Sequence, residues 1–301
     1  MKVKRLYFNS LLLCTTYSPK IYLMNILLPT DFSNRSIISI YYAAKIARKM
    51  NAEIILLYVA PMDTGAGATS SLKAGQLLDL SSKNALEDLQ IMAHKLKQDV
   101  GSDLKVRCEV VQGFSLEQAV GKFSAENQID FIVMGTKGAS GLKKILLGSN
   151  TTAVIASSNI PVIAVPEFAY FDNIHQILYA SDLQDVEQEV KALQPFAQLF
   201  HASIHLLHIV APGSEEASRV ETLKESLSKQ YGHLDITIQV SVHDNVPDAI
   251  EATLKESGAR MLAMFTHKPT FFEKLFGKSM TREMAFHDNV SLLSFKKSGL
   301  G

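Results

Sequence analysis

The chain has 301 residues, of which 47% are hydrophobic and 20% charged, a composition typical of soluble globular proteins and long enough for two domains. Lysine plus arginine and aspartate plus glutamate each number 30, so no net basic charge attracts nucleic acid or an anionic membrane. Two cysteines, Cys14 and Cys108, argue against a disulfide scaffold and fit a reducing cytoplasm.

The first 23 residues differ from the rest of the chain. They carry basic residues before a short apolar stretch, as a secretory signal would, but Asn9 and Ser10 interrupt that stretch. Met24 then stands directly before the next apolar run. We therefore interpret residues 1–23 as an extension that is disordered or follows from a misplaced start codon. The sequence holds no apolar run of about 18 residues, so it predicts no transmembrane helix.

Strand and helix patterns alternate from residue 24 onwards. Continuous apolar runs at 26–28 and 54–59 predict parallel strands that are covered on both faces. Strict alternation of apolar and polar residues at 104–110 predicts a half-exposed strand at a sheet edge. This order predicts a parallel sheet with right-handed crossovers. Helical stripes are formed by Ile37, Ile40, Tyr41 and Ala44, by Leu86, Leu89, Ala93 and Leu96, and by Leu116, Ala119, Val120 and Phe123.

The most specific motif follows the apolar run 131–134. Gly135 and Gly138 are separated by two residues, and nine residues then lead to Gly148 and Ser149. Glycines let backbone amides approach an anion closely, and a helix that starts near Ser149 adds free N–H groups and the positive end of its dipole. This combination favours a phosphate site.

The spacing resembles the nucleotide-binding signature of the universal stress protein family, which reads glycine, two residues, glycine, nine residues, glycine, then serine or threonine. Other features of that family stand in order: PTDFS at 29–33, LYV at 57–59 and NIPV at 159–162. An ordinary pair of turns in an α/β domain is the alternative, and the three further segments argue against it.

The resemblance implies an α/β fold of two tandem, doubly wound parallel-sheet domains. Both would be Rossmann-like, of the adenine-nucleotide-binding type, and would pack together as a pseudo-dimer. Ligands of such sheets lie at the carboxyl ends of the strands, near the point where the strand order reverses. Asp31, Val59 and Gly135 all fall at predicted strand ends, so we expect them to converge on one crevice.

The resemblance also implies a ligand, ATP, which we expect with Mg²⁺. The glycine loop and the helix start would line the phosphates, and Gly135 would let the loop pass near the ribose. Asp31 would bond near the ribose and adenine, and Val59 would meet the base through its backbone. The alternative role of Asp31 is to cap the helix predicted over 33–50, and the two roles are compatible. The candidate nucleotide-binding residues are Pro29, Thr30, Asp31, Val59, Met134, Gly135, Gly138, Gly148, Ser149, Asn150 and Thr151.

The chain is a tandem repeat. ILLPTD at 26–31 realigns with ILYASD at 177–182, and LKVRCEV at 104–110 realigns with LDITIQV at 234–240. The segment 62–82, rich in glycine, alanine, serine and threonine, is present only in the first copy and predicts a flexible loop beside a helix start. The predicted divisions are an extension at 1–23, a first universal stress protein domain at 24–168 and a second at 172–297.

The second copy has lost the glycine cradle. The three glycines of the first copy align with Phe265, Lys268 and Lys278, although Ser279 and Thr281 persist. A bulky side chain at the first of these positions would block close backbone approach. We therefore expect that the second domain does not bind ATP in the family manner.

The second half also carries eight of the nine histidines. His243 and His267 fall at predicted strand ends, so a metal or ligand pocket is one interpretation. Dispersed histidines are the other, and we favour it because no zinc-type spacing completes a ligand set. The apolar segment 271–276 is expected to pack on the sheet or to form an interaction surface.

The first half contains no arrangement of side chains that indicates catalysis. We expect a cytoplasmic stress-response protein that binds ATP in its first domain and acts as a nucleotide-dependent regulatory or interaction protein. Its protein partner is unknown, neither nucleic acid nor membrane is expected to bind, and a homodimer remains open beside the intramolecular pseudo-dimer. The alternatives are a slow ATP-hydrolysing enzyme of the same fold group and an interaction scaffold with a structural nucleotide.

Two other α/β classes fit less well. A phosphoacceptor receiver domain would need a second acidic residue beside Asp31 and a lysine after the last strand, where the first copy has Pro166. A dinucleotide-binding dehydrogenase would need a glycine fingerprint after its first strand, and none follows that strand here.

Overall fold

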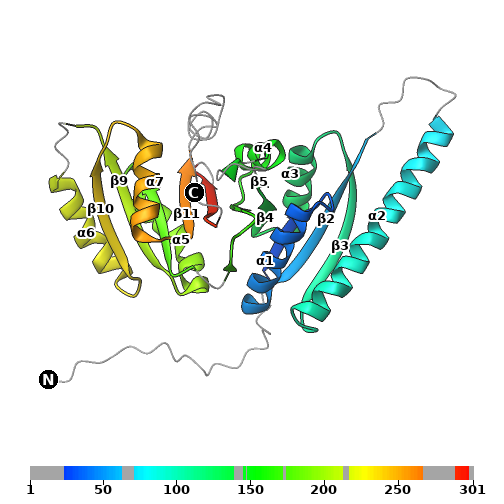
Figure 1. The fold of residues 1–301 in the computed structure, drawn as a ribbon, viewed down its shortest axis with the longest axis horizontal. Helices are drawn as coiled ribbons and strands as arrows, with labels where there is room; N and C mark the ends of the chain where they lie inside the picture. The colour runs from blue at the N-terminus through cyan, green and yellow to red at the C-terminus, as the bar shows by residue number, and fades with distance from the viewer. Residues whose placement is uncertain are drawn as a thin grey trace, which may run out of the picture.

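The computed structural model describes residues 24–62, 71–138, 145–146, 148–171, 174–212, 217–266 and 289–297. The predicted extension at 1–23 lies outside the described residues, as do the apolar segment 271–276 and the second-half positions Lys268, Lys278, Ser279 and Thr281. In the described part, strands and helices alternate along the chain as the sequence pattern predicted, apart from three places where strands follow one another directly (Figure 1).

Over its described residues, the first half contains five strands of the main sheet, two very short strands and four helices. The strands are β1 (Asn25–Pro29), β2 (Glu53–Pro61), β3 (Lys105–Gly113), β4 (Phe131–Gly135), β5 (Lys137–Gly138), β6 (Ile145–Leu146) and β7 (Val162–Val165). The helices are α1 (Asn34–Met50), α2 (Ser71–Asp99), α3 (Leu116–Asn127) and α4 (Ser149–Ser157).

The second half repeats the same order of elements over its described residues. Its strands are β8 (Gln176–Ser181), β9 (Ser203–Val210), β10 (Ile236–Val242), β11 (Met261–Thr266) and β12 (Ser291–Lys296). Its helices are α5 (Val186–Phe200), α6 (Ala217–Tyr231) and α7 (Val246–Ser257).

One ten-stranded sheet runs through both halves in the order β10-β9-β8-β11-β12-β7-β4-β1-β2-β3. Neighbouring strands within each half are parallel. If the main-sheet strands of each half are numbered one to five along the chain, both halves have the order 3-2-1-4-5 from the outer edge of the sheet to the junction. The halves meet where β7 and β12 pair antiparallel, with Ile163 opposite Leu293. Such pairing of the same strand from two copies is the arrangement of a two-fold dimer, so the repeat forms an intramolecular pseudo-dimer.

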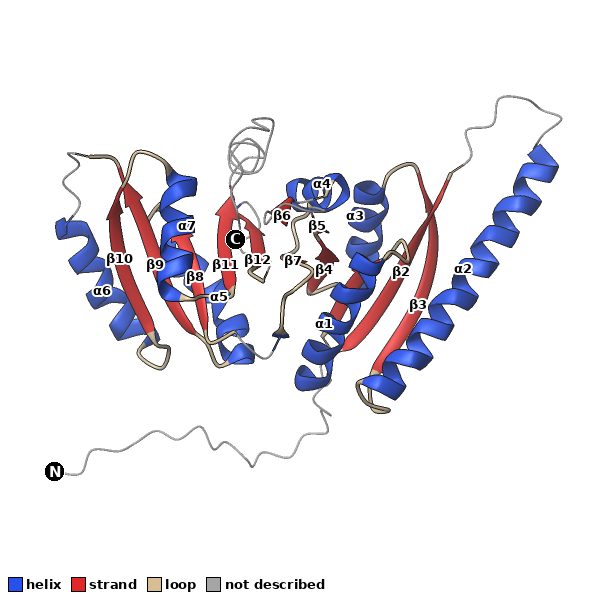
Figure 2. Cartoon of the chain, in the orientation of Figure 1, coloured by secondary structure: helices blue, strands red, loops and turns tan. Residues whose placement is uncertain are grey.

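Helices cover both faces of the sheet, which makes the fold doubly wound (Figure 2). One core contains Ile40 of α1 and Leu193 of α5, together with buried residues of α2 and α6. The core on the other face contains Val120 of α3 and Ile250 of α7, together with α4. Because successive side chains of a strand point to opposite faces, Leu27 belongs to the second core while its neighbours belong to the first.

The two halves share the first of these cores. The ring of Phe196 on α5 lies 5.6 Å from that of Phe131 at the start of β4, and 5.7 Å from that of Phe295 on β12. Both contacts have the edge-to-face geometry that aromatic pairs favour. The junction therefore continues the protein interior.

The edge position predicted for 104–110 is confirmed, since β3 is the last strand of the sheet and most of its residues are half-buried. The loop predicted at 62–82 is wrong in its second part, because α2 already begins at Ser71. The domain boundaries at 168 and 172 stay a prediction. Among the described helices, none combines the length and the apolarity needed to cross a membrane.

Candidate functional site

The carboxyl ends of β1 and β4 lie side by side at the point where the strand order of the first half reverses. The two strands are direct neighbours, with Ile26 opposite Phe131. Chain connections run outward from β1 to β2 and β3, and from β4 to β7 on the other side. Loops that follow such a pair of strands diverge to opposite faces and leave a crevice between them. Of the predicted residues, Pro29 ends β1 and Gly135 ends β4.

Thr30 holds the loop after β1 in place. Its side chain is buried, its hydroxyl donates to Ser36 Oγ over 2.9 Å, and the same hydroxyl accepts the N–H of Phe32 over 3.0 Å. Its own N–H donates to the carbonyl of Leu57 on β2 over 2.9 Å. Thr30 therefore anchors the loop after β1, in which its neighbour Asp31 is exposed to solvent.

Asp31 is exposed, and its carboxylate accepts the N–H of Ser33 over 3.0 Å. Partial burial by itself raises the pKa of Asp31, but hydrogen bonds from Ser33 and Ser36 outweigh it and hold the pKa below its ordinary value. The alternative role predicted for Asp31 is wrong, because the cap of α1 is Ser33, whose side chain accepts from the N–H of Ser36. Asp31 is therefore an exposed anion at neutral pH, placed just after the carboxyl end of β1.

Gly135 is required by packing as well as by the motif. A Cβ atom at this position would lie 2.6 Å from the carbonyl oxygen of Arg35 in the first turn of α1. A contact under 3 Å with backbone cannot relax through a side-chain rotation, so any other residue would push β4 and α1 apart. The sequence predicted a glycine here because the loop would pass close to a ribose. The packing of β4 against α1 gives a second reason for glycine at this position.

The first turn of α4 faces the end of β4. Thr151 is buried, and its hydroxyl donates to the carbonyl of Gly135 over 2.8 Å. Gly148 occupies the N-cap position and supplies no side-chain hydrogen bond, and the first turn holds no acidic residue. Ser149 and Asn150 are exposed. The N–H groups of this turn have no partner inside the helix, so they are available to an anion.

The loop that contains the glycine motif folds back on itself as a short hairpin between β4 and α4. β5 and β6 pair antiparallel, with Gly138 opposite Ile145. This pairing brings the chain from the end of β4 back toward Gly148, while residues 139–144 and 147 lie outside the described part. Met134 is buried in the core on the α3 side, so it can reach a ligand only through its backbone.

Val59 lies on the other side of β1, two residues before β2 ends. The carbonyl of Leu57 points toward β1, where it accepts from Thr30. Backbone groups of alternate residues in a strand point to the same side, so the N–H and C=O of Val59 also point toward β1. The paired part of β1 ends at Pro29, opposite Leu57. These groups therefore point toward the loop that follows β1, beyond the paired part of that strand.

Sequence reasoning missed Thr136, which directly follows Gly135. Its side chain is buried, and its hydroxyl finds no hydrogen-bond partner among the described residues. The signal was available, because Thr136 is one of the two residues between the glycines of the motif.

The equivalent edge of the second half is built differently. Phe265, which replaces Gly135, is buried with its ring stacked 4.4 Å from that of Phe295 and edge-on to Tyr179. Lys297 follows β12 as Pro166 follows β7, and its ammonium group contacts Asp182, the counterpart of Asp31. Sequence reasoning also missed this lysine, although a charged residue directly after a buried strand was a visible signal.

The second-half histidines are dispersed in the described part. His243 accepts the N–H of Asn245, His205 contacts Gln239 and Thr237, and the buried His208 contacts the carbonyl of Ser181. Over the described residues, no group of three histidine, cysteine, aspartate or glutamate side chains is arranged to hold a metal ion. His267 lies outside those residues.

Comparison with known proteins gives one consistent result. The profile of the universal stress protein family matches residues 23–166. Two universal stress proteins of Methanocaldococcus jannaschii align at 31% identity over 140 residues and at 32% over 157 residues; each alignment covers 46% of this chain, and they cover 80% and 93% of the relatives. The crystal structure of a universal stress protein from Archaeoglobus fulgidus DSM 4304 superposes with a TM-score of 0.68 at 19% identity, over 91% of this chain and 98% of its own. The likeness in fold therefore spans both halves.

Proposed function

The chain belongs to the universal stress protein family, and we propose that its first half binds ATP as a complex with Mg²⁺. The protein would then act in a stress response as a nucleotide-dependent regulatory or interaction protein. The observation that carries this proposal is the uncapped start of α4, which the Thr151 hydrogen bond holds against the end of β4 at the crevice.

The start of α4 fits a polyphosphate. Free N–H groups and the helix dipole both favour negative charge there, and the glycine at the N-cap leaves the approach open. The exposed Ser149 and Asn150 can add side-chain hydrogen bonds to the phosphates. Gly138 would contribute its backbone from the hairpin that returns toward this turn.

The other side of the crevice fits a ribose and a purine base. Asp31 is exposed and ionised at neutral pH, so its carboxylate can accept hydrogen bonds from ribose hydroxyls. The backbone of Val59 points toward the same opening and can pair with polar atoms of a base. Mg²⁺ would arrive with the phosphates, because this ion keeps several waters and needs few protein ligands.

The described side chains of the crevice supply binding groups and no placed general base. His94, the histidine of the first half, is exposed on α2 and contacts Gln98. We therefore propose binding as the function, with slow hydrolysis as the alternative. Steady-state release of phosphate from ATP, compared between the parent protein and Asp31→Ala, distinguishes the two.

Titration calorimetry with Mg²⁺–ATP tests the proposal. We expect one site per chain in the parent protein and none in the double variant Gly138→Val, Gly148→Val. Gly121→Val is the matched control, because the space around Gly121 on α3 is open. If the nucleotide-free parent protein binds no ATP, an interaction scaffold is the better account of its function. Two sites per chain would contradict the prediction that the second half, which lacks the glycines of the motif, does not bind ATP.

The same titration with cAMP, which one solved universal stress protein holds, tests whether the site prefers a triphosphate. A regulatory role requires that ATP bind two states of the protein, or of its complexes, with different affinity. If the double variant Gly138→Val, Gly148→Val binds its protein partner as the parent does, the alternative of an interaction scaffold with a structural nucleotide is favoured. We place this action in the cytoplasm, in line with the low cysteine content.

A further inference from the structure

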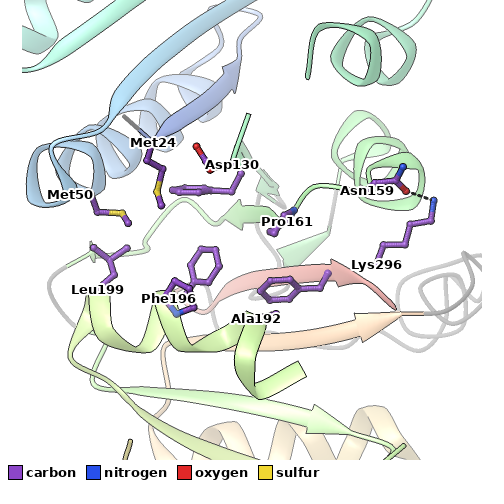
Figure 3. A pocket seen from close by; sticks show the side chains of 12 residues that line it. Met24, Met50, Asp130, Asn159, Pro161, Ala192, Phe196, Leu199 and Lys296 are labelled. Carbon is purple, nitrogen blue, oxygen red and sulfur yellow. Dashed lines mark hydrogen bonds between the residues drawn. The ribbon is translucent and has the colours of Figure 1, made fainter. Parts of the chain in front are cut away.

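A cavity of about 290 Å³ lies at the junction of the two halves. Its lining combines Phe131 and Pro161 of the first half with Phe196, Leu199 and Phe295 of the second half. Figure 3 shows Pro161, Phe196 and Leu199 around it. The cavity sits beside the amino ends of β4 and β7. It is therefore at the opposite end of these strands from the crevice of the proposed nucleotide site.

The antiparallel junction creates this cavity. Because β12 runs opposite to β7, its carboxyl end lies next to the amino end of β7. The helix α5 crosses over this boundary and contributes Ala192, Phe196 and Leu199 to the lining. Neither half alone could form these walls, so the cavity is a product of the tandem arrangement.

The lining is mostly apolar, with the cation Lys296 at one end and the carboxylate of Asp130 beside Met24 at the other (Figure 3). That carboxylate accepts the N–H of Asn25 over 2.7 Å. Aromatic, leucine and methionine side chains cover most of the wall, and Met24 and Met50 lie at the end away from Lys296 (Figure 3). Lys296 Nζ donates to Asn159 Oδ1 over 2.9 Å. No carboxylate of the described residues lies within ion-pair distance of this ammonium group. An apolar cavity with a cation at its mouth complements an amphipathic anion.

We propose that this cavity binds a small aliphatic carboxylic acid of medium chain length. The alkyl chain would lie among Phe131, Phe196 and Leu199, and the carboxylate would replace or share the Asn159 contact of Lys296. The volume suits this size, because it is about twice that of an engineered cavity of about 150 Å³ that holds benzene. Typical ligand cavities begin at about 300 Å³ and combine apolar walls with a few polar groups, as here.

This proposal does not depend on nucleotide binding, since the two sites lie at opposite ends of β4. Saturating Mg²⁺–ATP should therefore leave the acid able to bind. Loss of acid binding on addition of ATP would show that the acid had entered the nucleotide crevice, and would overturn the proposal.

Calorimetric titration of the full chain with decanoate below its micelle concentration is the test. We expect one saturable site, about tenfold weaker binding in Lys296→Gln, and loss of binding in Ala192→Phe, which fills the cavity from α5. Lys191→Gln, an exposed lysine on the same helix, should bind as the parent does. Decanol should bind more weakly than decanoate and should not respond to Lys296→Gln.

Circular dichroism melting checks that each variant is folded, and Lys296→Gln keeps the test valid should Ala192→Phe fail to fold. Absence of saturable binding to the parent protein would overturn the proposal. So would decanoate affinity that Lys296→Gln leaves unchanged.

Discussion

The ammonium group of Lys297 lies 2.8 and 3.0 Å from the two carboxylate oxygens of Asp182. The same nitrogen lies 2.9 Å from Glu189 and 3.6 Å from Asp185, and only 3% of the lysine side chain is exposed. Burial lowers the pKa of Lys297, but its hydrogen bonds to Asp182 and Glu189 outweigh burial and raise the pKa above its ordinary value. The lysine is therefore charged at every physiological pH.

This ion cluster stands at the edge of the second half that corresponds to the proposed nucleotide crevice of the first. Asp31 offers an exposed carboxylate there, whereas Asp182 is already bound by the lysine of its own chain. Glu189 is buried and also accepts from the hydroxyl of Tyr179. The cluster thus supports the prediction that the second half does not bind ATP.

Replacement of Lys297 should strongly destabilise the protein. Lys297→Met leaves Glu189 buried without its cation, and breaking a buried pair on one side costs about 3 to 5 kcal/mol. We expect the lower end, about 3 kcal/mol, because Asp182 is half-exposed and water can solvate it. Urea denaturation measures the free energy of unfolding, with the exposed Lys191→Met as the control. A loss below about 1 kcal/mol would contradict a stabilising role.

Asp31 should make stability depend on pH on the acid side. Its pKa is lowered from 3.8 in the folded state, so the unfolded state takes up the proton first. The contribution is therefore present above pH 3.8 and is lost as the pH falls through the folded value. It should be below about 1 kcal/mol, because the group is exposed. The difference in unfolding free energy between the parent and Asp31→Asn should shrink as the pH falls from about 6 to about 2.5. A difference that stays constant over this range would contradict a contribution of the Asp31 carboxylate to stability.

Gly135→Ala should lower stability even without nucleotide. The added Cβ would meet the Arg35 carbonyl oxygen at 2.6 Å, and overpacking of this kind costs about 1 to 3 kcal/mol. Gly121→Ala is the matched control, because nothing lies within 4 Å of its added Cβ. That control should be neutral or more stable by up to about 1 kcal/mol, since alanine favours a helix. Equal thermal midpoints for both variants would refute the packing role of Gly135.

Thr151→Val should loosen the start of α4. It removes the hydroxyl that donates to the Gly135 carbonyl, at a cost of about 1 to 3 kcal/mol in unfolding free energy. Mg²⁺–ATP affinity should fall with it, because the helix start is then no longer held against β4. Thr151→Ser keeps the hydroxyl and should restore most of both quantities. Denaturant titration measures the free energy of unfolding, and calorimetry measures the Mg²⁺–ATP affinity. If Thr151→Val binds ATP as the parent does, the start of α4 is not part of the nucleotide site.

Periodicity and glycine spacing in the sequence determined the fold class, the repeat and the convergence of loops on one edge. Apolar runs predicted β1 and β2, alternation at 104–110 predicted the edge strand β3, and the glycine motif predicted the α4 start. These features depend on consecutive residues, because strand and helix periods are local properties of the chain. Local patterns could not show that α2 begins at Ser71, since its first turns lie in a stretch of small and polar residues.

Only the tertiary structure decided which groups from distant parts of the chain meet. The contact of Lys297 with Asp182 joins residues 115 positions apart, and the pairing of β7 with β12 joins the two halves. Likewise Arg35 explains Gly135 although no local pattern links them. Such contacts depend on crossover connections and on sheet register, which place distant segments within a few ångströms of each other. The sequence predicts the residues proposed to bind a phosphate, and the packing of α1, α4 and β4 decides how those residues are presented at the end of β4.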